Sequence, residues 1–111
     1  RALWLERLRA AGFALPVLVH ARAWVSPSAV LEPGAVVLAQ AAVGARAHIG
    51  AGCIVNMGAL VDHDCVLGAC VHLAPGAVVK ACCTVGAGQK IESGAVVERG
   101  TALSAQGGAY V

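Results

Sequence analysis

The chain has 111 residues, enough for one domain and too few for two ordinary ones. Apolar residue types make up 59% of it and aromatic types 4%, so its interior must be built from Val, Leu, Ile, Ala and Gly. The 8 basic and 6 acidic residues give a net charge of +2 and form no cluster, which argues against nucleic-acid binding. No apolar run approaches the roughly 18–20 residues of a membrane helix, so we expect no membrane segment.

The chain has 5 cysteines, an odd number, so they cannot all pair with one another. The adjacent residues Cys82 and Cys83 cannot form an ordinary unstrained disulfide. Free thiols in a reducing cytoplasm are the simpler interpretation. The cysteine spacing also lacks the paired pattern, with matching histidines, that a zinc site needs. We therefore predict no metal.

The first predicted element is a short amphipathic helix in residues 1–12, where Leu5 and Leu8 share one face and Gly12 ends the helix. We expect this helix to cap the open end of the repeat that follows it. Residues 1–18 comprise this helix and a lead-in to the repeat. The first residue is Arg rather than Met, so we expect the chain to be cut from a longer one.

A repeat of six residues follows, in which every anchor position holds Val, Leu or Ile. These three types fill 31 of the 111 positions, so fifteen consecutive matches in one phase are not a chance effect. The anchors are Val19, Val25, Leu31, Val37, Val43, Ile49, Val55, Val61, Leu67, Leu73, Val79, Val85, Ile91, Val97 and Leu103.

Each six-residue unit, or hexad, fits a short strand and a tight turn. The fourth residue after each anchor is nearly always small, and Cys53, Cys65 and Cys83 occupy this slot as small hydrophobic residues. Seven glycines fall three residues after an anchor, where a bend favours positive φ. We predict an all-β domain, residues 19–111, in which three hexads make one turn of a triangular parallel β-helix of about five coils.

Residues 19–108 resemble the hexapeptide-repeat acyltransferases, whose fold is a left-handed parallel β-helix. The stretch CIVNMGALVDHDCVLGACVHLAPGAVV, residues 53–79, is similar to the sialic acid O-acetyltransferase and UDP-4-amino-sugar N-acetyltransferase family. The left hand comes from this resemblance, since physical rules alone favour a right-handed crossover. The resemblance implies an enzyme that transfers acetyl from acetyl-CoA to an amine or hydroxyl of a nucleotide-linked sugar, by direct attack on the thioester. It also implies that residues 1–18 are the possible remnant of a nucleotide-sugar domain, which precedes the coils in the family.

The family motif also implies roles for residues in this stretch. His63 lies two residues after an anchor, at a corner where its side chain can point outward, and it matches the family's general base. Asp64 would orient the imidazole, and Asp62 is a rival partner. Asn56 and His72 match family residues that contact substrate, acetyl donor or imidazole.

Turns that line the coenzyme groove of the family correspond here to Lys80-Ala81 and to residues 91–95, which include Ser93. The resemblance implies that Lys80, Ala81 and Ser93 contact acetyl-CoA, although Ala81 and Glu92 depart from the family pattern. Because His63 and His72 are half a coil apart, they lie on different sides of the prism. A homotrimer, as in the family, would bring two chains to each site.

Two alternatives remain. A zinc carbonic anhydrase can be built on the same coil, but the spacing of the four histidines does not stack three ligands. A non-catalytic trimeric scaffold, or an inactive fragment, would share the repeat without the chemistry.

Overall fold

The structure is a computed structural model that describes residues 1–106. Within this range one helix, α1 (Ala2–Ala10), is followed by fifteen strands of two residues each. Residues 107–111 of the expected repeat domain, including the inward slot at Gly107, lie outside the described residues. No helix in residues 1–106 has both the length and the apolar character needed to cross a membrane.

The strands form three parallel sheets of five strands each, which we name A, B and C. Sheet A contains β1 (Leu18–Val19), β4 (Val36–Val37), β7 (Ile54–Val55), β10 (His72–Leu73) and β13 (Lys90–Ile91). Sheet B contains β2 (Trp24–Val25), β5 (Ala42–Val43), β8 (Leu60–Val61), β11 (Val78–Val79) and β14 (Val96–Val97). Sheet C contains β3 (Val30–Leu31), β6 (His48–Ile49), β9 (Val66–Leu67), β12 (Thr84–Val85) and β15 (Ala102–Leu103).

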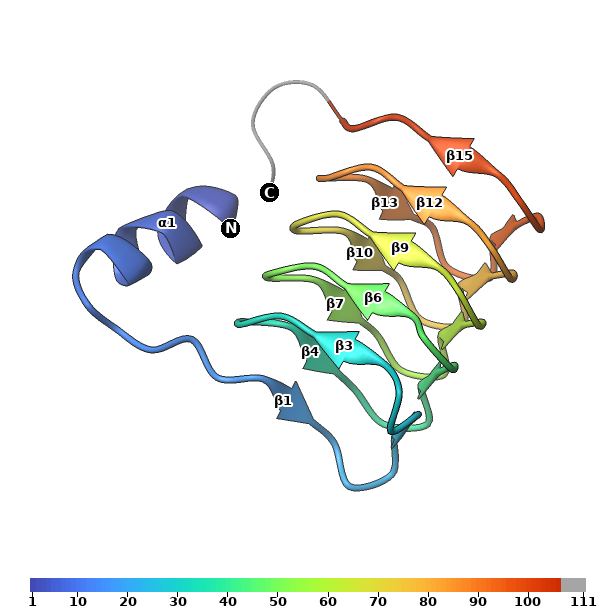
Figure 1. The fold of residues 1–111 in the computed structure, drawn as a ribbon, viewed down its shortest axis with the longest axis horizontal. Helices are drawn as coiled ribbons and strands as arrows, with labels where there is room; N and C mark the ends of the chain where they lie inside the picture. Colours follow the sequence, from blue (N-terminus) through green and yellow to red (C-terminus); the bar gives the residue numbers. More distant parts are fainter. Residues whose placement is uncertain (107–111) are drawn as a thin grey trace.

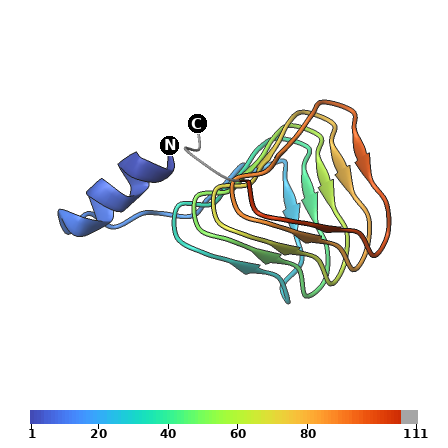
Figure 2. The same ribbon diagram turned by 90° about the horizontal axis from the view of Figure 1, so that it is seen from above.

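Successive coils stack with a register of eighteen residues, as the pairs Leu18 with Val36 and Val36 with Ile54 illustrate. Backbone hydrogen bonds run between coils, for example from Val36 N–H to Cys53 O at 2.9 Å. Figure 1 shows the coils side by side, and Figure 2 shows their triangular outline. The structure thus confirms the predicted β-helix of about five turns.

The core follows the predicted pattern of one large and one small inward residue per hexad. Val37, Ile49, Val61 and Leu73 are at most 1% exposed, and burying each such side chain is worth about 1.5–3 kcal/mol relative to leaving it in water. In the small slot the side chains of Cys53, Cys65 and Cys83 are fully buried, as predicted. Val19 is 45% exposed because it lies in the first coil, which has a neighbour on one side only.

Every bend position from residue 34 to residue 100, three residues after an anchor, has a positive φ. The seven glycines predicted there are confirmed. Five bends carry other residues, namely Gln40, Arg46, Asp64, Cys70 and Cys82, with φ between 57° and 63°. The left-handed conformation costs a residue with a Cβ roughly 1–2 kcal/mol, so the stacked coils impose it on these five.

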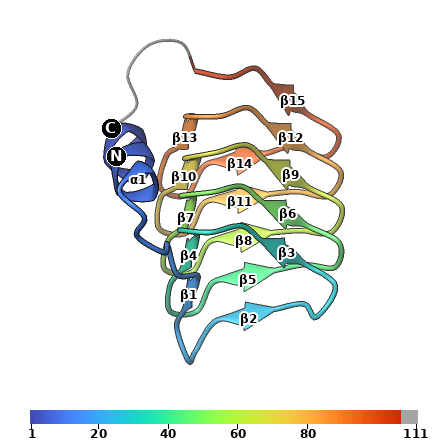
Figure 3. The ribbon, with the colours of Figure 1, turned by 60° about the vertical axis from the view of Figure 1, so that its left-hand side comes forward.

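Helix α1 forms as predicted, but it does not cap the end of the prism. It lies beside the stack, next to sheet A (Figure 3), with Leu5 against Gly34 and Gly52. The Arg1 guanidinium donates hydrogen bonds to the carbonyl oxygens of Gly52 and of Cys70. The helix contains no buried residue, so it contributes little to the core of the prism.

We predict that Gln40→Gly raises the free energy of unfolding by about 0.5–1 kcal/mol, because glycine relieves the left-handed strain and loses part of that gain to unfolded-state entropy. Gln40 has a φ of 63°, is exposed, and its side chain makes no hydrogen bond to the described residues. Urea unfolding at matched protein concentration would measure the change. Gln40→Ala keeps the strain and should show no gain; an equal gain in both variants would contradict the prediction.

Candidate active site

The predicted catalytic residues lie at the corner between β8 and β9, which we call the His63 corner. His63 Nδ1 lies 2.7 Å from Asp64 Oδ2, whereas Asp62 Oδ1 accepts a hydrogen bond from the backbone N–H of His63 at 2.7 Å. Asp64 rather than Asp62 is therefore the partner of the imidazole. Because a carboxylate only accepts hydrogen bonds, Nδ1 of the neutral imidazole is the donor and Nε2 carries the free lone pair.

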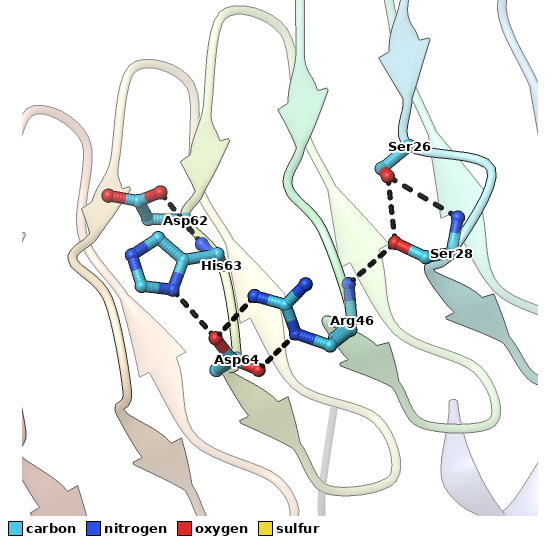
Figure 4. Close-up of polar contacts among 6 residues, drawn as sticks. All are labelled: Ser26, Ser28, Arg46, Asp62, His63 and Asp64. Atoms are coloured by element: carbon cyan, nitrogen blue, oxygen red, sulfur yellow. Dashed lines mark hydrogen bonds and ion pairs between the residues drawn. The ribbon is translucent and has the colours of Figure 1, made fainter.

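Arg46, one coil earlier, holds the other side of Asp64 (Figure 4). Its Nε donates to Asp64 Oδ1 at 2.8 Å and its Nη2 donates to Asp64 Oδ2 at 3.0 Å. Hydrogen bonds from Arg46 and then from His63 hold the pKa of the Asp64 carboxyl well below its usual range. The pair is exposed, so solvent and salt screen it and its value for stability is small.

The backbone of this corner is fixed by the same ladder that joins the coils. Asp64 N–H donates to Ala45 O at 2.9 Å, and Cys82 N–H donates to His63 O at 3.1 Å. Asp64 has a φ of 58°, a conformation that Asp adopts more readily than most residues because its short side chain bonds locally. The His63 side chain is partly exposed, so it faces outward with its ring available to a ligand.

The structure also adds Cys82 to the His63 corner. One ligand atom from each of His63, Asp64 and Cys82 lies within 4.8 Å of the others, a grouping that the cysteine spacing did not predict. Spacing along the chain missed it because Cys82 lies eighteen residues after Asp64, in the same column of the next coil. The Arg46 guanidinium occupies both oxygens of Asp64, and its positive charge opposes a metal cation there.

Two of the predicted coenzyme residues lie on the next coil at this corner. The ammonium group of Lys80 donates to Glu98 Oε1 at 2.8 Å, and both side chains are exposed. Ala81 is only 5% exposed, and its carbonyl oxygen accepts a hydrogen bond from Gly100 N–H at 3.1 Å. At this corner Lys80 therefore presents an exposed ammonium group, while Ala81 offers backbone and a methyl group.

Asn56 and His72 lie elsewhere, on sheet A and its edge towards sheet B: His72 begins β10, and Asn56 directly follows β7. Asn56 Nδ2 is 3.3 Å from His72 Nε2, so Asn56 pairs with His72 and not with the His63 imidazole that we also considered. Burial lowers the pKa of His72, and the positive charges of Arg1 and Lys90 lower it further. His72 is thus held neutral. Ser93 lies at the same edge, two coils beyond Met57 in the column, and is exposed.

The predicted site residues therefore form two groups in one chain. The His63 group contains Asp62, His63, Asp64, Lys80 and Ala81; the His72 group contains Asn56, His72 and Ser93. Sheet B lies between the two groups, because the His72 group precedes its strands and the His63 group follows them. Sequence analysis missed Arg46, although its eighteen-residue separation from Asp64 was a signal for the contact.

The fold is shared with solved acetyltransferases. No protein-family model matches the sequence, and no curated protein does. The acetyltransferase domain of PglB from Neisseria gonorrhoeae, in complex with acetyl coenzyme A, superposes with a TM-score of 0.92 at 42% identity over 94% of this chain. PerB from Caulobacter crescentus, in complex with CoA and GDP-perosamine, superposes with a TM-score of 0.82 at 34% identity over 93% of this chain.

The chain has the fold of these two acetyltransferase structures, a parallel β-helix of hexapeptide repeats. The resemblance noted in the sequence is thus confirmed. The chain spans 51% of the PglB domain and 58% of PerB, so about half of each solved chain has a counterpart here.

We predict that iodoacetamide modifies Cys82 in the native protein and leaves Cys53, Cys65 and Cys83 unmodified. Cys82 is exposed, whereas the other three side chains are fully buried and burial raises the pKa of Cys53 to about 11, which removes the reactive thiolate. Peptide mass mapping after brief labelling at neutral pH measures this, with labelling in urea as the control. Native labelling of Cys53 as fast as Cys82 would show that the coils open.

Proposed function

We propose that the chain transfers an acetyl group from acetyl-CoA to an amine or hydroxyl of a nucleotide-linked sugar. The observation that carries this proposal is the His63–Asp64 pair, with a separation of 2.7 Å, on an exposed corner of the acetyltransferase β-helix. Two similar structures support it, because one holds acetyl coenzyme A and the other holds CoA with a sugar nucleotide.

In the proposed reaction His63 is the general base. Its Nε2 takes a proton from the acceptor as the acceptor's nitrogen or oxygen attacks the thioester carbonyl carbon. The C–S bond then breaks, and the departing CoA thiolate takes up the proton that His63 holds. Asp64 keeps Nδ1 protonated, which leaves Nε2 free for the acceptor. No metal is required by these steps.

We propose that the active form is a homotrimer in which the His72 group of one chain faces the His63 group of another. The outer face of sheet B supports this, because it is apolar along its whole length: Trp24, Ala42, Leu60, Val78 and Val96. Trp24 is 57% exposed and Val96 is 47% exposed, and both would gain from burial against a partner. Such a contact would put Lys80, Ala81 and the partner's Ser93 along one groove for acetyl-CoA.

We place the reaction in the cytoplasm. All five cysteines are unpaired in the structure, and three of them serve as core residues, which suits a reducing compartment.

We predict that His63→Ala lowers the rate of acetyl transfer by about 10²–10⁴-fold and leaves acetyl-CoA binding intact, because it removes the base without touching the core. Coenzyme release with amino-sugar nucleotides measures the rate, and calorimetric titration measures binding. His20→Ala, at an exposed histidine before the first corner, is the matched control. Full activity in His63→Ala would refute the assignment of His63 as the general base. If the folded protein bound no acetyl-CoA, the scaffold alternative would be favoured.

We predict a mass in solution of three chains, and loss of that trimer in Leu60→Glu. Leu60 lies on the outer face of sheet B and is 38% exposed, so a carboxylate there would be desolvated in the proposed interface. Val66→Glu on sheet C is the matched control, since Val66 is 46% exposed and also points outward. Light scattering measures both; a wild-type monomer with full activity would rule the trimer out.

A further inference from the structure

The contact between Arg46 and Asp64 extends the proposed site by one coil. We propose that Arg46 is a positioning residue that holds Asp64, and through it His63, in the orientation that exposes the basic nitrogen. This inference rests on the proposed function, in which His63 is the base. Figure 4 shows Arg46 with Ser28 on one side and Asp64, followed by His63, on the other.

The geometry is that of a two-point clamp. The planar guanidinium donates to both carboxylate oxygens of Asp64, at 2.8 and 3.0 Å, while Asp64 Oδ2 also accepts from His63 Nδ1 at 2.7 Å. An exposed Asp–His pair alone would sample several side-chain rotamers, since neither side chain is packed in the core. Two parallel hydrogen bonds restrict the rotation of the Asp64 carboxylate. They therefore fix the position of the oxygen atom that accepts the hydrogen bond from His63.

Arg46 is itself held from the coil before it. Its backbone N–H donates to Ser28 Oγ at 3.0 Å, and Ser28 Oγ lies 3.0 Å from Ser26 Oγ. Ser26 is 7% exposed, the one buried polar residue in the described range. The backbone of Arg46 therefore belongs to a hydrogen-bonded column that crosses three coils, and its exposed side chain extends from that fixed point to Asp64.

Charge gives Arg46 a second effect. The His63 imidazole is flanked by Asp62 and Asp64 on its own corner, by Arg46 on the coil before, and by Cys82 and Lys80 on the coil after. Lys80 is paired with Glu98, so Arg46 is the cation that offsets the carboxylate bound to the imidazole. Arg46→Lys would keep this positive charge beside Asp64, whereas Arg46→Gln would remove it.

The test variant is Arg46→Gln, which removes the positive charge and the pair of guanidinium donors that bind Asp64. Glutamine is suited to the position, because Gln40 occupies the equivalent bend position of the preceding hexad with a φ of 63°, close to the 58° of Arg46. Arg46→Lys keeps the charge and loses the two-point geometry. Arg22→Gln is the matched control, since Arg22 is exposed and has the same place in its hexad at a different corner.

We expect Arg46→Gln to lower kcat about tenfold to a hundredfold with KM changed less than about twofold. Arg46→Lys should show a smaller loss of kcat than Arg46→Gln, because it keeps the charge and loses only the two-point geometry. In ¹⁵N spectra of the imidazole, the Nδ1–H form of His63 should be less populated in Arg46→Gln than in the wild type and Arg22→Gln.

Wild-type kinetics and an unchanged His63 spectrum in a folded Arg46→Gln would overturn the proposal. So would equal losses in Arg46→Gln and Arg22→Gln, because the effect would then not belong to the site. The spectrum separates this inference from the proposed function: if His63→Ala stays active, the base assignment fails, while the spectrum still reports whether Arg46 positions the imidazole.

Discussion

Stacking with an eighteen-residue register is the constraint on which the rest of the molecule depends. Three hexads close one turn, and backbone hydrogen bonds then place each residue beside the one eighteen positions earlier. Anchors therefore stack on anchors and corners on corners. A slip of one residue would turn every anchor outward, so burial of the core holds the polar columns in register as well. The contacts of Arg46 with Asp64, and of Asp64 with Cys82, are products of this register.

The corners show how this fold separates stability from chemistry. Core residues such as Val61 and Cys65 are fully buried, whereas the side chains of His63 and Asp64 between them are 44% and 39% exposed. A corner residue packs little, so it can be replaced at small cost to the core. What the corner demands is backbone conformation: Asp64 is left-handed, and the ladder on either side supplies the free energy that holds it there.

The separation of the two site groups links the chemistry to assembly. His63 follows the strands of sheet B and His72 precedes them, so the width of that sheet keeps them apart within a chain. The face between them is apolar and exposed, with Trp24 at one end and Val96 at the other. In the proposed trimer, contact between chains would bury this face and would also bring the His63 group of one chain to the His72 group of another. Assembly of the trimer and formation of the site would therefore occur together.

The sequence by itself determined the hexads, the anchors, the small inward slots, the glycine bends and the outward corner of His63, because a period of six is a local property of the chain. The tertiary structure alone decided that Asp64 and not Asp62 binds the imidazole, that Asn56 pairs with His72, and that α1 lies beside the stack. These depend on side-chain rotamers and on which coil lies against which. Two residues eighteen apart become neighbours only when the turn closes, and that closure brings Arg46 to Asp64.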